Sequence, residues 1–172
     1  MNLFANSGVK NGFLYGLLSI IFSHVCYMID PKMMLNGVAL LGFLITIYFM
    51  YRSAIEERRK NEGHLSFAEA LKVTFLTYVI GSLLGSIYVY LMFNVFAPEM
   101  NDVMREVSLD NAEFFAKLLG TEDQLDLMHD QIESQNIQMS FSMVFFNYLV
   151  RLIFPGFVFA LVISAITKKV DV

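Results

Sequence analysis

Four long apolar stretches constrain the fold of this 172-residue chain more than any other feature. They cover residues 12–29, 33–51, 73–97 and 139–167. Apart from His24 in the first and Arg151 in the fourth, they contain no basic or acidic side chain. About 20 such residues in a helix cross the hydrocarbon core of a bilayer, and the backbone must be helical there because lipid offers it no hydrogen-bond partner. The sequence therefore predicts an all-α integral membrane protein with four transmembrane helices.

The links between the stretches differ in length and composition. Residues 30–32 (Asp-Pro-Lys) predict a tight turn, because proline cannot continue the first helix. Residues 52–65 are polar and predict a solvated loop, which includes Glu56 and the four charged residues after it. Ser66 and Glu69 have the spacing of a capping box, so the third helix begins before the membrane. We expect a single membrane domain over residues 1–172, with transmembrane helices at about 12–29, 33–51, 70–97 and 139–167.

The distribution of Lys and Arg predicts the orientation, because cytoplasmic loops carry an excess of both. One side of the membrane is expected to hold Lys10, Arg52, Arg58, Arg59, Lys60, Lys72, Lys168 and Lys169. The other side is expected to hold Lys32, Arg105 and Lys117. We therefore expect a multi-pass membrane protein whose N- and C-termini are both cytoplasmic and whose segment 98–138 is extracytoplasmic.

The segment 98–138 is an acidic insertion between the third and fourth helices, with ten Asp or Glu against two Lys or Arg. Its apolar residues recur at helical spacing, and one predicted face contains Met100, Val103, Met104 and Val107. Two spacings are typical of helix starts: Asp110 with Glu113, and Thr121 with Gln124. Gly120 is a typical helix stop. We expect two or three short amphipathic helices that lie over the membrane domain or against a partner.

Small residues recur at four-residue spacing in the apolar stretches, where they allow helix backbones to approach closely in lipid. The candidate helix-packing residues are Gly12, Gly16, Gly81, Gly85, Gly156 and Ala160. They are expected to pack the four helices into one bundle. The alternative is that they mediate dimerisation or docking to another membrane protein.

Polar side chains inside a membrane are costly to bury, and they are functional candidates for that reason. Four of them fall in the outer halves of their helices: His24, Asn94, Asn147 and Arg151. Asn147 and Arg151 share a helix face with Pro155, which should kink the helix. The four side chains are hypothesised to form a polar pocket that opens outward, in which Arg151 would suit a phosphate or a carboxylate. The alternative for Arg151 is that its long side chain reaches the lipid headgroups without a specific ligand.

Composition and motifs argue against several functions. The chain is 56% apolar and 16% charged, and its net charge of −4 gives no basic surface for nucleic acid. The single Cys26 excludes a multi-cysteine metal site, and the three histidines are expected at different depths or sides of the membrane. The sequence lacks the motifs of zinc proteases, serine hydrolases and phosphate-binding loops. We expect no catalytic residue, no metal and no cofactor.

Three local patterns resemble the family of small bacterial membrane proteins known as domain of unknown function 4199. They are Leu65-Ser66-Phe67-Ala68-Glu69-Ala70-Leu71-Lys72 after a polar loop, Tyr88-x-Tyr90-x-x-Phe93-Asn94 before Pro98-Glu99, and a last helix with Gly156 that ends in Lys168-Lys169. The resemblance covers nearly the whole chain. It implies a four-helix inner-membrane protein and supplies no catalytic residue.

We expect a non-catalytic accessory or assembly subunit of an envelope membrane complex, whose partners are the lipid bilayer and another membrane protein or a second copy of itself. The basis is the small-residue spacing, the amphipathic insertion and the missing catalytic motifs. By analogy, one such partner class is a membrane glycosyltransferase that uses a polyprenyl-phosphate carrier. The alternative is a small transporter or polyprenyl-lipid flippase that works as an oligomer.

Overall fold

The prediction of an all-α protein is confirmed by the computed structural model, which describes residues 6–36, 38–121, 124–134 and 138–169. Within these ranges the extended backbone forms only an isolated bridge between Leu65 and Lys169. The helical elements are α1 (Ser7–Ile29), α2 (Pro31–Asn36), α3 (Val38–Lys60), α4 (Phe67–Leu91), the π-helical η2 (Met92–Phe96), α5 (Met100–Leu119), α6 (Leu125–Ser134), α7 (Phe141–Arg151), the π-helical η4 (Leu152–Phe157) and α8 (Val158–Thr167).

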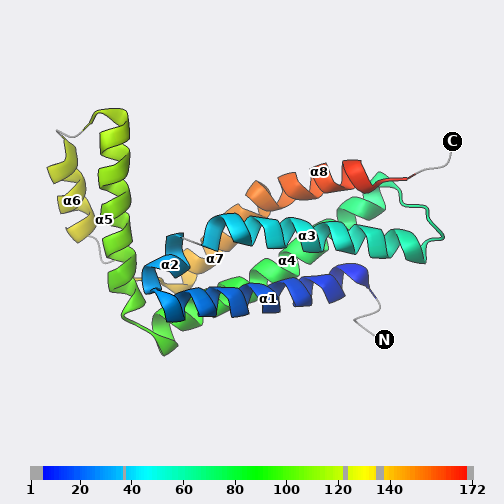
Figure 1. Cartoon of the computed structure of the whole chain (residues 1–172), viewed down its shortest axis with the longest axis horizontal. Coiled ribbons are helices and arrows are strands. Elements are labelled where there is room, and N and C mark those ends of the chain that lie inside the picture. Colours follow the sequence, from blue (N-terminus) through cyan, green and yellow to red (C-terminus); the bar gives the residue numbers. More distant parts are fainter. Residues whose placement is uncertain (1–5, 37, 122–123, 135–137, 170–172) are drawn as a thin grey trace.

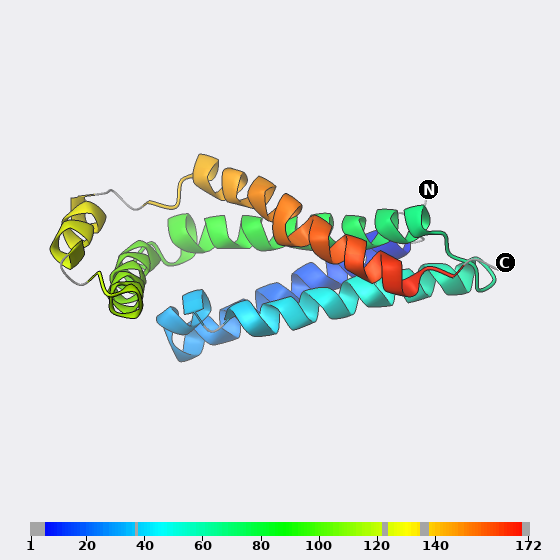
Figure 2. The ribbon, with the colours of Figure 1, turned by 90° about the horizontal axis from the view of Figure 1, so that it is seen from above.

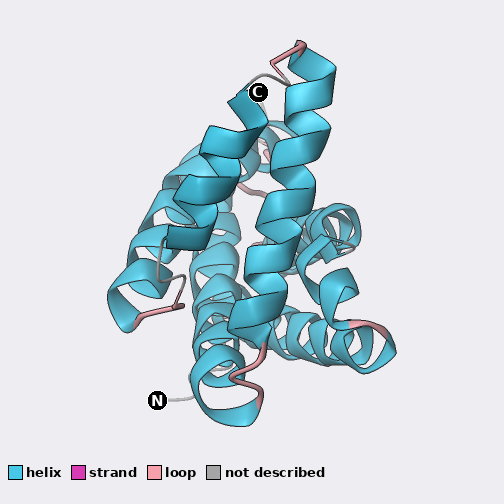
Figure 3. Cartoon of the chain, turned by 90° about the vertical axis from the view of Figure 1, so that its left-hand side faces the viewer, coloured by secondary structure: helices cyan, strands magenta, loops and turns pink. Residues whose placement is uncertain are grey.

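Four rods form an elongated bundle, in which α1, α3, α4 and the α7–α8 pair run side by side (Figures 1 and 2). The first and last described residues lie at one end of this bundle. Helices α5 and α6 lie at the opposite end, where α5 crosses the bundle transverse to its long axis; Figure 3 views the molecule from this end. Three helical stretches among the described residues are long and apolar enough to cross a membrane: Ser7–Ile29, Phe67–Phe96 and Phe141–Thr167.

The predicted second transmembrane helix, 33–51, differs most from the structure. A short helix, α2, begins at Pro31, because proline is well tolerated in the first turn, where its missing N–H needs no partner. Helix α3 begins at Val38 and continues past the apolar stretch to Lys60. The expectation of a solvated loop over residues 52–65 is therefore wrong for most of its length, since Glu, Arg and Lys are good helix formers. Helix α3 is not among the three candidate spans, so a fourth transmembrane helix stays a prediction.

The predicted start of the third helix is confirmed. Ser66 caps α4: its backbone N–H donates to Glu69 Oε2 (2.9 Å), and the Glu69 N–H donates to Ser66 Oγ (3.3 Å). The residue before the cap pairs with the end of the last helix, because Leu65 and Lys169 exchange backbone hydrogen bonds of 2.9 and 2.8 Å. The start of α4 and the end of α8 are therefore fixed to each other at one level.

The predicted kink at Pro155 is also confirmed. The backbone leaves helical geometry at Phe154 (φ −135°, ψ 122°), directly before the proline. The break divides the last rod into α7 and α8, which have different neighbours. Helix α8 packs against α3 and α4, whereas α7 packs against α4.

The described residues of the acidic segment form two helices, within the expected two or three, but α5 is not short, because it contains 20 residues against 10 in α6. Gly120 ends α5 in the left-handed conformation (φ 68°) that glycine adopts at low cost. The predicted helix start at Asp110 and Glu113 is wrong, because both residues lie inside α5. Their carboxylates pair with lysines instead: Asp110 with Lys32 at 3.1 Å, and Glu113 with Lys117 at 3.9 Å.

Glycines, which have no side chain, allow α1 and α4 to lie close together. A Cβ at Gly12 would lie 2.8 Å from the Ile80 Cβ, and one at Gly16 would lie 2.6 Å from the Leu84 Cδ1. A Cβ at Gly81 would lie 1.8 Å from the ring of Tyr15. These glycines therefore pack the helices of one chain against each other.

The other small residues divide into two groups. Gly156 makes room for the ring of Tyr78, which would lie 2.3 Å from a Cβ, and Ala160 is fully buried beside Met50. Gly85 was expected to pack as well, but among the described atoms nothing lies within 4 Å of its Cβ position. Gly85 therefore faces open space and takes no part in the bundle contacts described.

This difference yields a matched pair of substitutions in one helix. Gly81→Ala should destabilise the bundle by about 1–3 kcal/mol, because the added methyl displaces the packed Tyr15 ring. Gly85→Ala should leave stability unchanged or raise it by up to about 1 kcal/mol, because alanine is the better helix former. Thermal unfolding of the purified protein in mild detergent measures both. Equal losses in the two variants would contradict the packing described.

Candidate functional site

Two of the four residues predicted to form an outward pocket lie together. Asn147 and Arg151, one turn apart on α7, line a hollow of about 70 Å³ between α7 and α4. The rest of its lining is Ser86, Val89, Met139, Val144 and Tyr148. The hollow thus combines one cation, one amide and two hydroxyl groups with apolar walls.

The other two predicted residues are engaged elsewhere. The His24 Nδ1 lies 3.0 Å from the Tyr88 hydroxyl, in a contact between α1 and α4. The Asn94 amide donates to the backbone carbonyls of Tyr90 and Met139, each at 2.9 Å, and so ties η2 to the residues before α7. Neither side chain lines the hollow, so the structure does not bring the four residues together.

Arg151 is a charged residue within a candidate membrane span, and it is exposed. Its guanidinium has no carboxylate partner among the residues that the structure describes. Arg151 therefore stands at an exposed position of the span, with its charge unpaired among the described side chains.

An apolar hollow of about 230 Å³ lies beside the polar one. Its walls are Leu83, Ser86, Ile87, Tyr90, Phe141, Val144, Phe145 and Tyr148. Both hollows share Ser86, Val144 and Tyr148, so they flank the line of contact between α4 and α7 on its two sides. Sequence reasoning missed Tyr148 and Ser86 as lining residues; the available signal was their position next to Asn147 and Gly85. Together the hollows suit an anionic group on one side and a hydrocarbon chain on the other.

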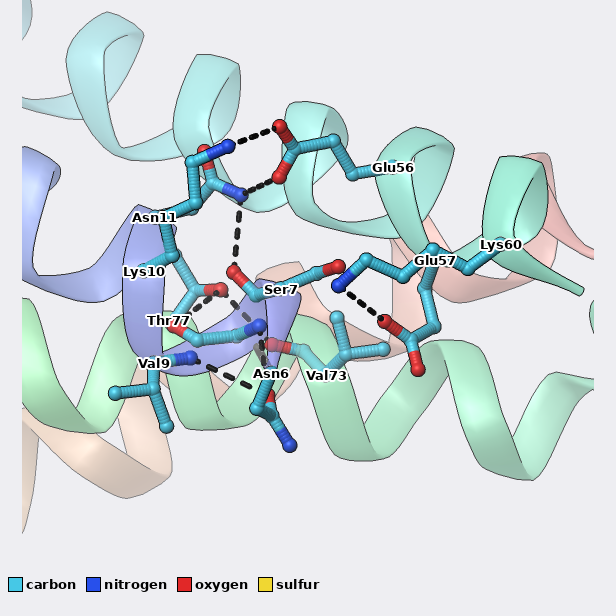
Figure 4. A network of polar contacts seen from close by, with 11 residues as sticks. Asn6, Ser7, Val9, Lys10, Asn11, Glu56, Glu57, Lys60, Val73 and Thr77 are labelled. Atoms are coloured by element: carbon cyan, nitrogen blue, oxygen red, sulfur yellow. Dashed lines mark hydrogen bonds and ion pairs between the residues drawn. The ribbon is translucent and has the colours of Figure 1, made fainter. Parts of the chain in front are cut away.

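A second polar cluster lies at the opposite end of the bundle (Figure 4). The Glu56 carboxylate on α3 pairs with the Lys10 ammonium (2.8 Å) and accepts a hydrogen bond from the Asn11 amide (2.7 Å), both on α1. The Asn11 amide also donates to the Ser7 carbonyl (2.9 Å), and the Thr77 hydroxyl on α4 lies 3.3 Å from the Gly8 carbonyl. This cluster joins α1 to α3 and α4. It was missed in the sequence because residues 52–65 were interpreted as a loop.

The surroundings of Glu56 shift its protonation. Partial burial raises the pKa of its carboxyl, but the hydrogen bonds from Lys10 and Asn11, with the nearby charges of Lys10 and Arg52, outweigh burial and hold the pKa below its ordinary value. A depressed pKa means that the ionised form stabilises the fold above the ordinary pKa, and that this contribution is lost as the pH falls through the folded pKa. The cluster is therefore a structural clamp that weakens in acid.

The part of the chain that the structure describes contains no candidate metal site. No group of three or more His, Cys, Asp or Glu side chains there has an arrangement that could hold a metal ion. The outer histidine, His129, lies 3.7 Å from the Glu113 carboxylate, in a contact between α6 and α5.

Comparison with known proteins identifies the family. Residues 10–169 match the family described as "Protein of unknown function (DUF4199)", and the chain belongs to this family. The resemblance noted in the sequence is thereby confirmed. No curated protein and no solved structure matches the chain.

Glu56→Gln tests the polar cluster that joins α1 to α3 and α4. We expect it to cost about 1 kcal/mol of stability at neutral pH, because it removes a partly exposed ion pair and weakens a hydrogen bond. The difference from the unchanged protein should shrink at acid pH, as the pH falls through the depressed pKa of Glu56 and the native carboxyl also becomes protonated. Thermal unfolding in detergent at both pH values measures this, with the exposed Glu62→Gln as the control. A loss that does not depend on pH would contradict the role of the charge.

Proposed function

We propose that the chain is a four-span protein of the bacterial inner membrane, with both termini in the cytoplasm and with α5 and α6 outside. Helix α3 runs beside the three candidate spans through the length of the bundle (Figure 1). It exposes large apolar side chains at Leu41, Phe43, Leu44 and Ile47. Contiguous apolar surface of this kind suits lipid and is rare on monomeric soluble proteins. Four crossings also agree with the position of both described chain ends at one end of the bundle.

Within this topology, the protein binds an anionic lipid at Arg151. The observation that carries this proposal is the unpaired guanidinium, which lines a hollow with Asn147 inside a candidate span. Charged groups in a membrane normally pair or contact a polar ligand, and a guanidinium matches the geometry of a phosphate. A lipid phosphate therefore supplies the counter-charge that the described side chains do not.

The biological role that we propose is that of a non-catalytic accessory or assembly subunit of an envelope membrane complex. The exposed side chains of η4 support a partner in the membrane, since Ile153 and Phe154 are both about 70% exposed. Gly85 supports it as well, because this small residue of α4 opens onto free space. The partner is another membrane protein or a second copy of this chain.

A transporter or polyprenyl-lipid flippase is the alternative, and one observation weighs against it. Three hydroxyl groups in the half of the bundle near the start of α1 and the end of α8 bond to carbonyls of their own helices: Thr74 to Ala70 (2.9 Å), Ser164 to Ala160 (2.6 Å) and Thr167 to Ile163 (2.7 Å). Side chains bonded in this way pack helices and do not offer a polar path. The polar hollow that Arg151 lines lies beside α7.

Arg151→Gln tests the lipid site. The tagged protein is purified from its native membrane in mild detergent, and its lipids are quantified by mass spectrometry. We expect a phosphate-bearing lipid at near-stoichiometric amounts in the unchanged protein, and about tenfold less in the variant, which corresponds to the loss of about 1.4 kcal/mol. The control is Arg59→Gln, an exposed arginine at the other end of the bundle. Equal lipid in both variants, with thermal stability preserved, would overturn the proposal.

The same purification tests the subunit role through its protein content. A second membrane protein at fixed stoichiometry, or a defined homo-oligomer, is expected. Repeated recovery of the chain as a lipid-bound monomer would exclude a stable complex and leave the lipid site standing on its own.

A further inference from the structure

One face of α5 is buried near the start of the helix and exposed near its end. Near the start of α5, Met100 is fully buried in the core cluster at the end of the bundle, and Val107, seven residues later on the same helix face, is 6% exposed. Val103 and Met104, on the same face, pack against the core cluster around Cys26, Met34, Met92 and Phe93. This half of the face is covered by the bundle.

The same face continues toward the C-terminal end of α5 without a cover. Phe114 follows Val107 by seven residues, as Val107 follows Met100, so the three side chains lie along one line of the helix. Phe115 and Leu118 flank this line. Phe114, Phe115 and Leu118 are 61%, 52% and 67% exposed. An apolar stripe that is buried in its first half is therefore exposed in its second.

Helix α6 does not cover this stripe. It packs on α5 at the side away from the bundle (Figures 1 and 2). Ala112 and Ala116 are buried in α5 and lie on the side of the helix opposite the stripe, where α6 approaches. The exposed stripe therefore points in the same direction as the buried one, toward the plane in which the bundle ends.

The C-terminal half of α5 projects past the bundle in that plane (Figures 1 and 3). The candidate span Phe67–Phe96 contains 30 residues, or about 45 Å at helical rise, which matches the thickness of a bilayer with its headgroups. The end of the bundle therefore lies at headgroup level. Any part of α5 that projects beyond it must lie against the surface of the bilayer.

We infer that the C-terminal half of α5 is an interfacial helix, which lies on the outer leaflet and inserts Phe114, Phe115 and Leu118 between lipid headgroups and acyl chains. This inference rests on the proposed four-span topology. An amphipathic helix with aromatic and leucine side chains on one face lies in the membrane interface in this way. Two ion pairs hold α5 in the required orientation, since Lys32 lies 2.6 Å from Glu106 and 3.1 Å from Asp110.

Charge identifies the lipid class. Segment 98–138 contains ten acidic and two basic residues, so anionic headgroups do not attract it. Insertion must therefore depend on the apolar side chains, and zwitterionic lipid is sufficient. A second copy of the chain or a soluble protein is the competing occupant of the stripe.

The absence of tryptophan makes a direct test possible, because one introduced Trp becomes the sole strong fluorophore. Phe115→Trp is placed in the full chain, reconstituted in vesicles of phosphatidylcholine, and compared with vesicles whose acyl chains carry bromine near the headgroup. Asp130→Trp, at an exposed position on α6, is the matched control on the far side of α5. We expect bromine to quench the Phe115→Trp emission strongly and to leave Asp130→Trp unchanged.

A third variant separates this inference from the topology on which it rests. Phe146→Trp lies on the exposed face of α7 inside a candidate span. Bromine placed deep in the acyl chains must therefore quench its emission if the bundle is in the membrane. Quenching of Phe146→Trp without quenching of Phe115→Trp would overturn the interfacial helix and leave the topology intact. A blue-shifted but unquenched Phe115→Trp would assign the stripe to a protein surface. Failure to quench Phe146→Trp would overturn both.

Discussion

The close approach of α1 to α4 is the contact on which the rest of the structure depends. In lipid the hydrophobic effect does not drive helices together, so association depends on backbones that can approach closely. Gly81 provides the space in which the Tyr15 ring lies. The hydroxyl of Tyr15 then meets Thr46 on α3, and its ring stacks on Tyr78, which fits against Gly156. The absence of a side chain at Gly81 thereby determines how α1, α3 and α4 pack against one another.

The two ends of the bundle serve different purposes. The end at which α1 begins and α8 ends is closed by charges and hydrogen bonds between helices, with Glu56 at the centre. Toward the other end, the break at Pro155 separates α7 from the packing of α8, and α7 keeps α4 as its principal neighbour. The hollows beside the α4–α7 contact follow from this break, and they place Arg151 where a ligand can reach it. The site is therefore a consequence of incomplete packing.

Sequence patterns predicted the helices well and the site only in part. The cap at Ser66, the stop at Gly120 and the kink at Pro155 are local effects of single residues, so they could be predicted without knowledge of the fold. Which helix face meets which neighbour depends on the order of helices, which no local pattern encodes. Asn147 and Arg151 line the same hollow because both lie on α7. His24 instead contacts Tyr88, between α1 and α4.

The four-span topology supports every functional conclusion, and the accessibility of single cysteines tests it most directly. In a Cys26→Ala background, one cysteine is placed at Glu62, at Asp126 or beyond either end of the chain, and intact spheroplasts are treated with a membrane-impermeant thiol reagent. The account predicts labelling of Asp126→Cys in intact cells, and labelling of the other three positions only after the membrane is permeabilised. Labelling of Glu62→Cys, or of one chain end, from outside would show that α3 does not cross the membrane or that the orientation is reversed, and would contradict the account.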